Sequence, residues 1–237
     1  MTENRLYFRQ LLAGRDFALG DPIATQMRNF AYLIGDRETG DCVVVDPAYA
    51  AQDLIDVAAE DGMNVSGVLV THHHPDHIGG SMLGFNLKGL AELLETTQVA
   101  VHVNENEKPW VARVTGIAES ELTGHSHRDK ISVGAIEIEL LHTPGHTPGS
   151  QCFLLDGHLV AGDTLFLDGC GRTDFPGGDS DEIYRSLQNL AALENDPVVF
   201  PGHWYSPAPS AKLSEVRGSN YVFRPKSLAD WRAMMGG

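Results

Sequence analysis

The string THHHPDH at residues 71–77 constrains this chain more than any other feature of its sequence. It places four histidines and one aspartate within six positions, directly after an apolar run at 65–70 that predicts a buried strand. Neighbouring imidazoles and a carboxylate are costly to bury unless a metal ion or charged partners accompany them. This strand is therefore expected to end at a polar site, and a metal site is the interpretation we favour.

Three further strands are expected to end in the same way. His146, Asp163 and His203 each follow an apolar run within a few residues. If these strand ends share one edge of a sandwich, the side chains converge on one pocket and each has a rigid support. A single histidine after a strand is usually an ordinary loop residue, so it is the repetition of the pattern that indicates a shared site.

The donor types indicate divalent transition metals. Imidazole and carboxylate ligands suit zinc, iron or manganese, whereas softer sites use thiolate. The candidate ligands outnumber the four positions around one tetrahedral zinc ion. Adding Asp76 and Asp163 suggests two ions about 4 Å apart, bridged by a carboxylate and a hydroxide. We therefore expect two divalent ions, zinc in the first place, with iron or manganese as alternatives.

The remaining sequence alternates between strand and helix patterns. Strands are expected at residues 6–12, 30–34, 42–45, 65–71, 99–103, 131–141, 151–155, 158–161 and 197–200. Helices are expected at residues 51–61, 87–95, 104–114 and 179–193. Buried and half-exposed strands with interleaved helices predict an α/β sandwich. The HxH pair of His125 and His127 is expected in a solvated loop, because no strand pattern precedes it.

An excess of acidic residues narrows the possible partners. The 237 residues include 32 Asp and Glu but 17 Lys and Arg, a formal charge of −15. Such a surface repels phosphate backbones and anionic lipid, so we expect no nucleic-acid or membrane partner. Glu3, Arg5 and Arg9 interrupt any apolar core of a secretory leader. Three cysteines are too few and too scattered for a disulfide framework, and we expect a reducing, cytoplasmic location.

Taken in order, the strings THHHPDH, HTPGHTPGS and GDTLF, with the late GH at 202–203, resemble the metallo-β-lactamase-fold hydrolases. Within that family they look most like the glyoxalase II group. The resemblance extends from about residue 30 to residue 205. It implies a four-layer αβ/βα sandwich with metals at one edge, formed by a single domain spanning 1–237 with a short C-terminal tail after about 206.

The resemblance also implies a role for each candidate ligand. It assigns three ligands to each of two ions and one bridging carboxylate: His72, His74 and His146; Asp76, His77 and His203; and Asp163. Asp76 and Asp163 are the expected catalytic carboxylates, and His73 is the variable position of the motif. Asp46, in VVVDP, is either a buried carboxylate that orients the ligands or a simple cap of the turn.

The expected substrate-binding residues are Arg172 and Tyr205. Arg172 stands where glyoxalase II has a lysine that meets a glutathione carboxylate, and a guanidinium can clamp a carboxylate with two hydrogen bonds. Asp174, two residues on, would repel such an anion, and CGRTDF at 170–175 instead resembles the persulfide dioxygenases of the same fold. Tyr205 matches a substrate-contacting tyrosine of glyoxalase II, with a packed aromatic as the simpler interpretation.

These observations favour a binuclear metal-dependent hydrolase, in which a metal-bound hydroxide attacks a small-molecule thioester such as a hydroxyacyl-thiol. The alternative enzyme is a persulfide dioxygenase with one ferrous ion held by His72, His146 and Asp163 and open positions for oxygen. A further alternative is a non-catalytic metal-binding module, which the complete ligand set disfavours. Metal content separates the two enzymes, because the hydrolase needs two ions and the dioxygenase one iron.

Overall fold

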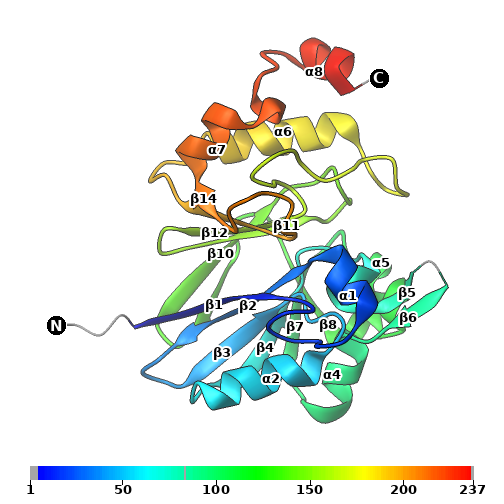
Figure 1. Cartoon of the computed structure of the whole chain (residues 1–237), viewed down its shortest axis with the longest axis vertical. Coiled ribbons are helices and arrows are strands. Elements are labelled where there is room, and N and C mark those ends of the chain that lie inside the picture. The colour runs from blue at the N-terminus through cyan, green and yellow to red at the C-terminus, as the bar shows by residue number, and fades with distance from the viewer. Residues whose placement is uncertain (1–4, 83, 236–237) are drawn as a thin grey trace.

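The chain forms two six-stranded sheets that pack face to face in the computed structural model, which describes residues 5–82 and 84–235 (Figure 1). In spatial order, sheet 1 contains β1 (Leu6–Leu12), β2 (Phe30–Asp36), β3 (Asp41–Val45), β4 (Asn64–Leu69), β7 (Ala100–Asn104) and β8 (Leu122–His125). Sheet 2 contains β14 (Ala211–Lys212), β13 (Val198–Pro201), β12 (His158–Gly162), β11 (Gln151–Leu155), β10 (Ile136–His142) and β9 (Lys130–Val133). A small ribbon pairs β5 (Gly80–Met82) with β6 (Phe85–Leu87).

Helices cover the outer face of each sheet. The helices on the side of sheet 1 are α1 (Pro22–Met27), α2 (Ala51–Glu60), α4 (Leu90–Thr96) and α5 (Lys108–Thr115). Those on the side of sheet 2 are α6 (Ser180–Ala191), α7 (Leu213–Ser219) and α8 (Leu228–Met235). Figure 1 shows the four layers stacked from α2 and α4 at the bottom to α6 and α7 near the top. The expected four-layer sandwich is therefore confirmed.

Three apolar layers hold these elements together, and β10 and α6 show how the sequence builds them. On β10, Ile138 and Leu140 join the core between the sheets, whereas Leu141 joins the core under α6. This division follows from the period-two alternation of a strand. Helix α6 begins after Asp179, whose side chain accepts hydrogen bonds from two backbone N–H groups of the first turn. Its buried stripe of Ile183, Ser186, Leu187 and Leu190 faces sheet 2 at helical spacing.

Strand directions explain why polar residues collect at one edge of each sheet. In sheet 1, β3, β4 and β7 run parallel to one another. In sheet 2, β12 runs parallel to β13, and β10 shares their direction because both β10 and β12 pair antiparallel with β11. Since parallel strands end at a common edge, these strands deliver their following loops there.

Three expected elements have different boundaries in the structure. The strand expected at 131–141 is the hairpin of β9 and β10, because Gly134, with a φ of +58°, permits a turn between them. The helix expected at 87–95 begins at Leu90, since 85–87 pairs as β6. The helix expected at 104–114 begins at Lys108, because the chain first makes a turn at 105–107.

The expectation of a solvated loop for the HxH pair was wrong for its first member. His125 ends β8, a strand that pairs in parallel with β7, and its Nε2 lies 2.8 Å from Nδ1 of His102. The strand was missed because its LTGH sequence has little β-branched or apolar character. His127 is exposed beyond the strand end.

The segment after residue 206 extends sheet 2 and covers its outer face. It supplies β14, α7, a 3₁₀ turn at Tyr221–Phe223 and α8. The Trp231 side chain is fully buried against α6, and its indole N–H donates to the Ser180 carbonyl at 2.7 Å. Residues 1–4, 83 and 236–237 of the expected 1–237 domain lie outside the described residues. Within 5–82 and 84–235, none of the helices has both the length and the apolar content needed to cross a bilayer.

Candidate metal centre

The loop after β4 places its histidines through one short helix. Residues 70–74 form a loop after the strand, and α3 (Pro75–Ile78) then begins with Pro75, whose fixed φ suits the first helical turn. Asp76 and His77 lie in this helix and are buried. His72 and His74 share one group of possible ligands and Asp76 and His77 share another, so one short segment serves two groups.

The first group, which we call the first triad, contains His72, His74 and His146. One ring nitrogen from each of these residues lies within 4.8 Å of the others. The ring centroids are 4.6 Å apart for His74 and His146 and 4.8 Å apart for each of the other two pairs. His72 and His74 follow strand β4 of sheet 1, whereas His146 follows β10 of sheet 2.

The second triad contains Asp76, His77 and His203. The Nε2 atoms of the two histidines are 3.3 Å apart, and Asp76 Oδ2 lies 3.7 Å from His77 Nε2 and 3.4 Å from His203 Nε2. All three side chains are buried. Like the first triad, this one takes two residues from the loop after β4 and one from sheet 2, because His203 follows β13.

Asp163 lies between the triads. Its Oδ1 is 3.4 Å from His77 Nε2, and its Oδ2 is 3.3 Å from His203 Nε2 and 3.7 Å from His146 Nε2. The chain leaves room for this close approach at Gly202, where a Cβ atom would come within 2.2 Å of Asp163 Oδ1. The structure therefore brings all seven sequence-predicted ligands together in one small volume.

Hydrogen bonds behind the ligands fix their orientation. Asp46 accepts from the Thr71 backbone N–H at 2.8 Å and from His77 Nδ1 at 2.9 Å, so its carboxylate orients the ligand loop as well as capping the turn. His146 Nδ1 donates to the Arg172 carbonyl at 2.6 Å. His203 Nδ1 likewise donates to a carbonyl, that of Met27, at 2.9 Å. When Nδ1 is the donor in this way, Nε2 is the ring nitrogen that faces the shared volume.

Electrostatics differ between the triads. Burial and neighbouring imidazoles hold the pKa of His72 far below its usual value, and the same causes lower the pKa of His74 to about 3. Burial also lowers the pKa of His146. In the second triad burial acts in the same direction on His203, but the carboxylates of Asp163 and Asp76 outweigh it and raise its pKa.

The carboxylates are held ionised by the same contacts. Burial favours the neutral form of Asp76 and Asp163, yet the neighbouring histidines of the second triad lower the pKa of both carboxyl groups. The centre therefore combines imidazoles of lowered pKa on one side with carboxylates and two imidazoles of raised pKa on the other.

Unpaired buried atoms show that these residues fit metal ions. His72 Nε2, His146 Nε2 and Asp163 Oδ1 are buried and have no hydrogen-bond partner among the described residues. Leaving three such acceptors unpaired is costly unless something else binds them. Neutral imidazole nitrogens and carboxylate oxygens are the donors that zinc, iron and manganese accept. Each triad could thus hold one divalent ion, with Asp163 able to reach both.

Three residues that support this centre lie outside the sequence motifs described above. Buried Asn29 donates from Nδ2 to Asp76 Oδ2 at 3.1 Å, and Tyr49 donates its hydroxyl hydrogen to Asn29 Oδ1 at 2.9 Å. Glu107, which has no exposed surface, accepts from the His73 backbone N–H at 2.8 Å and from the Gly149 N–H at 2.7 Å. Glu107 therefore ties the loop after β4 to the loop that carries His146. It follows the end of β7, so the strand-end pattern could have identified it.

The two expected substrate residues lie on opposite sides of the centre. The Tyr205 ring stacks on His203 with centroids 4.7 Å apart, and its side chain is 54% exposed. The Arg172 guanidinium forms a fork with Asp174, with hydrogen bonds of 2.9 and 2.6 Å, and lies over the Phe175 ring. Phe175 in turn packs edge-on against His74. The expected clamp for a carboxylate thus already has an internal partner.

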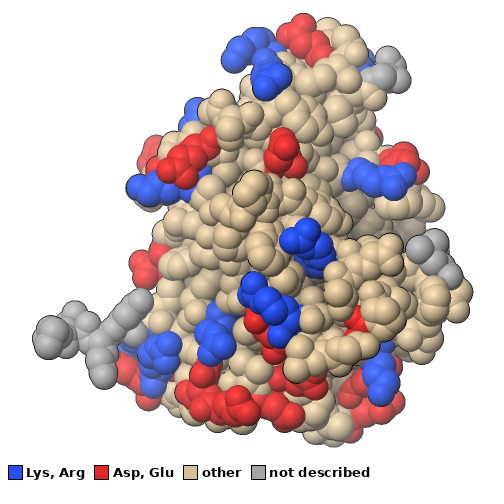
Figure 2. Space-filling view, in the orientation of Figure 1, with Lys and Arg blue, Asp and Glu red and all other residues tan. Residues whose placement is uncertain are grey.

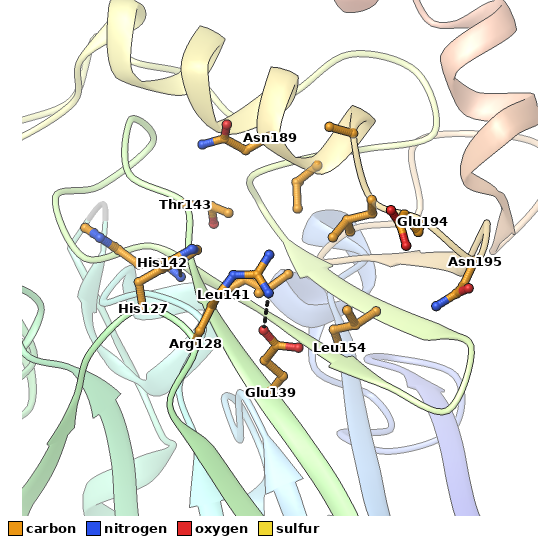
Figure 3. A pocket seen from close by; sticks show the side chains of 13 residues that line it. His127, Arg128, Glu139, Leu141, His142, Thr143, Leu154, Asn189, Glu194 and Asn195 are labelled. Atoms are coloured by element: carbon orange, nitrogen blue, oxygen red, sulfur yellow. Dashed lines mark hydrogen bonds and ion pairs between the residues drawn. The ribbon is translucent and has the colours of Figure 1, made fainter.

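A separate cavity of about 640 Å³ lies between the outer face of β10 and β11 and the C-terminal end of α6 (Figure 3). Its wall includes His127, His142 and the ion pair of Arg128 with Glu139, and the seven predicted ligands are absent from its lining. His142 Nε2 is bonded to the Pro148 carbonyl, so this histidine is engaged in holding the following loop. The candidate functional site is therefore the histidine cluster and not this cavity.

Comparisons with known proteins agree with this geometry. Residues 24–203 match the family model described as the metallo-beta-lactamase superfamily. A hydroxyacylglutathione hydrolase from Pseudomonas fluorescens is 36% identical over 207 residues, covering 86% of this chain and 73% of that protein. The mitochondrial persulfide dioxygenase ETHE1 of Homo sapiens is 34% identical over 196 residues, covering 81% of this chain and 70% of that protein.

A solved structure gives the same result in three dimensions. The crystal structure of ETHE1 from Myxococcus xanthus superposes with a TM-score of 0.78 at 29% identity, covering 98% of this chain and 90% of that one. The family model covers residues 24–203, and the overall fold superposes on that solved structure. The chain therefore belongs to the metallo-β-lactamase superfamily.

Proposed function

We propose that this chain is a metal-dependent hydrolase that cleaves a small-molecule thioester with two divalent ions, zinc in the first place. One observation carries the proposal: two complete triads face the same carboxylate, Asp163, whose oxygens lie 3.3–3.7 Å from nitrogens of both. A site for a single ion has no need of the buried set formed by Asp76, His77 and His203. The completeness of both triads also disfavours a non-catalytic binding module.

The side chains divide the work between them. His72, His74 and His146 would hold the first ion, Asp76, His77 and His203 the second, and Asp163 both. When bound, such ions lower the pKa of water and stabilise the oxyanion that forms as a thioester is cleaved. Asp46 and the carbonyls of Arg172 and Met27 keep the imidazoles in the orientation that this chemistry needs.

The exposed residues beside the centre support a substrate with little negative charge on its thiol part. Phe175 and Tyr205 offer aromatic surface on either side of the ligands. Arg172 is already paired with Asp174, which would repel a second carboxylate. We therefore infer that lactoyl-glutathione, which brings two carboxylates, is cleaved poorly, and that a thioester of a less anionic carrier thiol is cleaved better.

A persulfide dioxygenase is the second candidate. Relatives with that name match this chain about as well as those named hydroxyacylglutathione hydrolase, at 34% and 36% identity. The three ligands that a single ferrous ion would need, two histidines and one aspartate, also lie close together. His72 and His146 belong to the first triad, and Asp163 Oδ2 lies 3.7 Å from His146 Nε2. Two imidazoles and one carboxylate on one face of a single ferrous ion suit oxygen chemistry.

Metal analysis and two assays on one preparation decide between the candidates. The protein is purified without chelator or added metal, and its zinc, iron and manganese are counted per chain. About two ions per chain with thioester cleavage supports the hydrolase. About one iron per chain, with oxygen uptake on glutathione persulfide and no thioester cleavage, would replace it with the dioxygenase.

The proposal includes a cytoplasmic location, no nucleic-acid or membrane partner, and a single domain. Cys42, Cys152 and Cys170 are all free thiols, as expected in a reducing cytoplasm. Acidic side chains gather along the lower margin of the face in Figure 2, over α2, which fits the expected lack of nucleic-acid or membrane partners. The packing of the segment after 206 on sheet 2 supports a single domain spanning 1–237.

A further inference from the structure

Asn29 is the neutral side chain that contacts every member of the second triad. It lies between α1 and β2 and is 3% exposed. Its Nδ2 atom is 3.1 Å from Asp76 Oδ2, 3.2 Å from His77 Nε2 and 3.4 Å from His203 Nε2. The hydrogen bonds of its side chain, within the described residues, involve only these three residues and Tyr49.

The position of the Asn29 amide is fixed from behind by Tyr49. The Tyr49 hydroxyl donates to Asn29 Oδ1 at 2.9 Å, and this side chain is itself buried. Tyr49 has a left-handed backbone with a φ of +70°, and its N–H donates to the Lys88 carbonyl. A bulky residue adopts this conformation only where surrounding contacts hold it. Tyr49, Asn29 and Asp76 thus form one chain of donated hydrogen bonds.

The hydrogen-bonding capacity of Asp76 determines which end of the Asn29 amide faces the second triad. An ionised carboxylate only accepts hydrogen bonds, so the NH₂ group of Asn29 must point to Asp76 Oδ2 and its oxygen to Tyr49. The amide therefore fixes the direction of that oxygen without adding charge. Hydrogen-bond partners behind metal ligands typically change metal affinity by about 10–100-fold.

We propose that Asn29, held by Tyr49, is a positioning residue that aligns Asp76 and thereby sets the affinity of the second triad alone for a divalent ion. The inference rests on the proposed two-metal function. Selectivity follows from the contacts, because neither Asn29 nor Tyr49 is hydrogen-bonded to the first triad within 5–82 and 84–235.

The test measures two zinc dissociation constants by competition with a chromophoric chelator, after the bound metal has been removed. Asn29→Leu keeps the size of the side chain but removes the donor, and should raise the second constant about 10–100-fold while leaving the first unchanged. Tyr49→Phe should raise the second constant by a smaller factor. Asn104→Leu is the matched control, since Asn104 is equally buried but, among the residues described, its side chain bonds only the Asn106 N–H.

A double variant separates positioning from a general structural role. If Tyr49 acts through Asn29, Tyr49→Phe should have no further effect on the second constant in the Asn29→Leu background. Independent, additive effects, or equal changes in both constants, would overturn the inference. Should Asn29→Leu fail to fold, Tyr49→Phe alone decides, and an unchanged second constant rejects the idea. A wild-type protein that binds only one ion would reject the two-metal function as well, whereas two ions with unaltered constants in Asn29→Leu reject the inference alone.

Discussion

The two triads sit side by side and have similar geometry, but they differ in how they treat protons. The first consists of three imidazoles whose pKa values are lowered, so they are neutral and their lone pairs are free at neutral pH. In the second, carboxylates raise the pKa of both His77 and His203, which favours their protonated forms. An ion entering the second triad therefore competes with protons for these imidazoles more strongly than an ion entering the first. Equal donor counts therefore do not imply equal affinity.

Removing the shared carboxylate should have the largest effect, because it weakens metal binding at both triads. Asp163→Ala deprives both triads of an oxygen, so binding at each should weaken more than ~100-fold, beyond the effect of losing a hydrogen-bond partner behind a ligand. His203→Ala should weaken only the second triad to this extent. Both variants are purified in parallel and their metal content is counted per chain. Equal loss of a single ion from the two variants would contradict the bridging position of Asp163.

Removing the hydrogen-bonded carboxylate behind His77 should affect the second triad more than the first. Asp46→Asn removes the charge that orients His77 but suits the left-handed backbone at this position, where φ is +53°. The second dissociation constant for zinc should rise about tenfold, the lower end of the range for such partners. The first should rise less, because the hydrogen-bonded path from Asp46 to His72 runs through the Thr71 hydroxyl.

Asp156→Asn provides the control for that experiment. Asp156 also has a positive φ, of +29°, but it lies in the exposed turn between β11 and β12. Its substitution should leave both constants at their wild-type values. A larger change at the first triad than at the second in Asp46→Asn would show that the carboxylate serves the other side of the centre.

The smallest effect is expected at the exposed ion pair beside the first triad. Arg172→Ala should raise the KM for an anionic thioester and leave kcat nearly unchanged, because a remote clamp contributes uniform binding. Asp174→Asn frees the guanidinium and should lower that KM. Solvent screens an exposed pair strongly, so neither change in KM should exceed about fivefold. Arg185→Ala, at an exposed pair on α6, is the control; a fall in kcat for Arg172→Ala would place Arg172 nearer the reaction.

The ligands can be predicted from the sequence because each follows a strand, and these strands all end at the same edge of the sandwich. His72, His146, Asp163 and His203 follow β4, β10, β12 and β13, which end at a common edge of their sheets. Each apolar run is visible in the sequence, and so is the polar residue after it. The resemblance to a known family added the pairing of ligands into two sets, which spacing alone leaves open.

Asn29 was not predicted as part of the site because of the strand topology. It stands before β2, not after it, and β2 runs antiparallel to β3, with Tyr32 opposite Val45. The start of β2 therefore lies at the edge where β3 ends, so residues that precede a strand also reach the centre. Recognising this requires knowing which strands are antiparallel, and that depends on pairing partners distant in the sequence. The hairpin turn at Gly134 was missed because the alternation of β9 and β10 continues through it.

Each triad draws two residues from the loop after β4 and one from sheet 2. On the proposed ligand assignment, an ion in either triad is a cross-link between the two halves of the sandwich. The unfolded chain does not hold those three donors together, so the ion binds the folded state and adds to its free energy of unfolding. An ion present at 100 times its dissociation constant adds about 2.7 kcal/mol in this way. The lifetime of the folded chain then depends on the free metal concentration around it as well as on its apolar core.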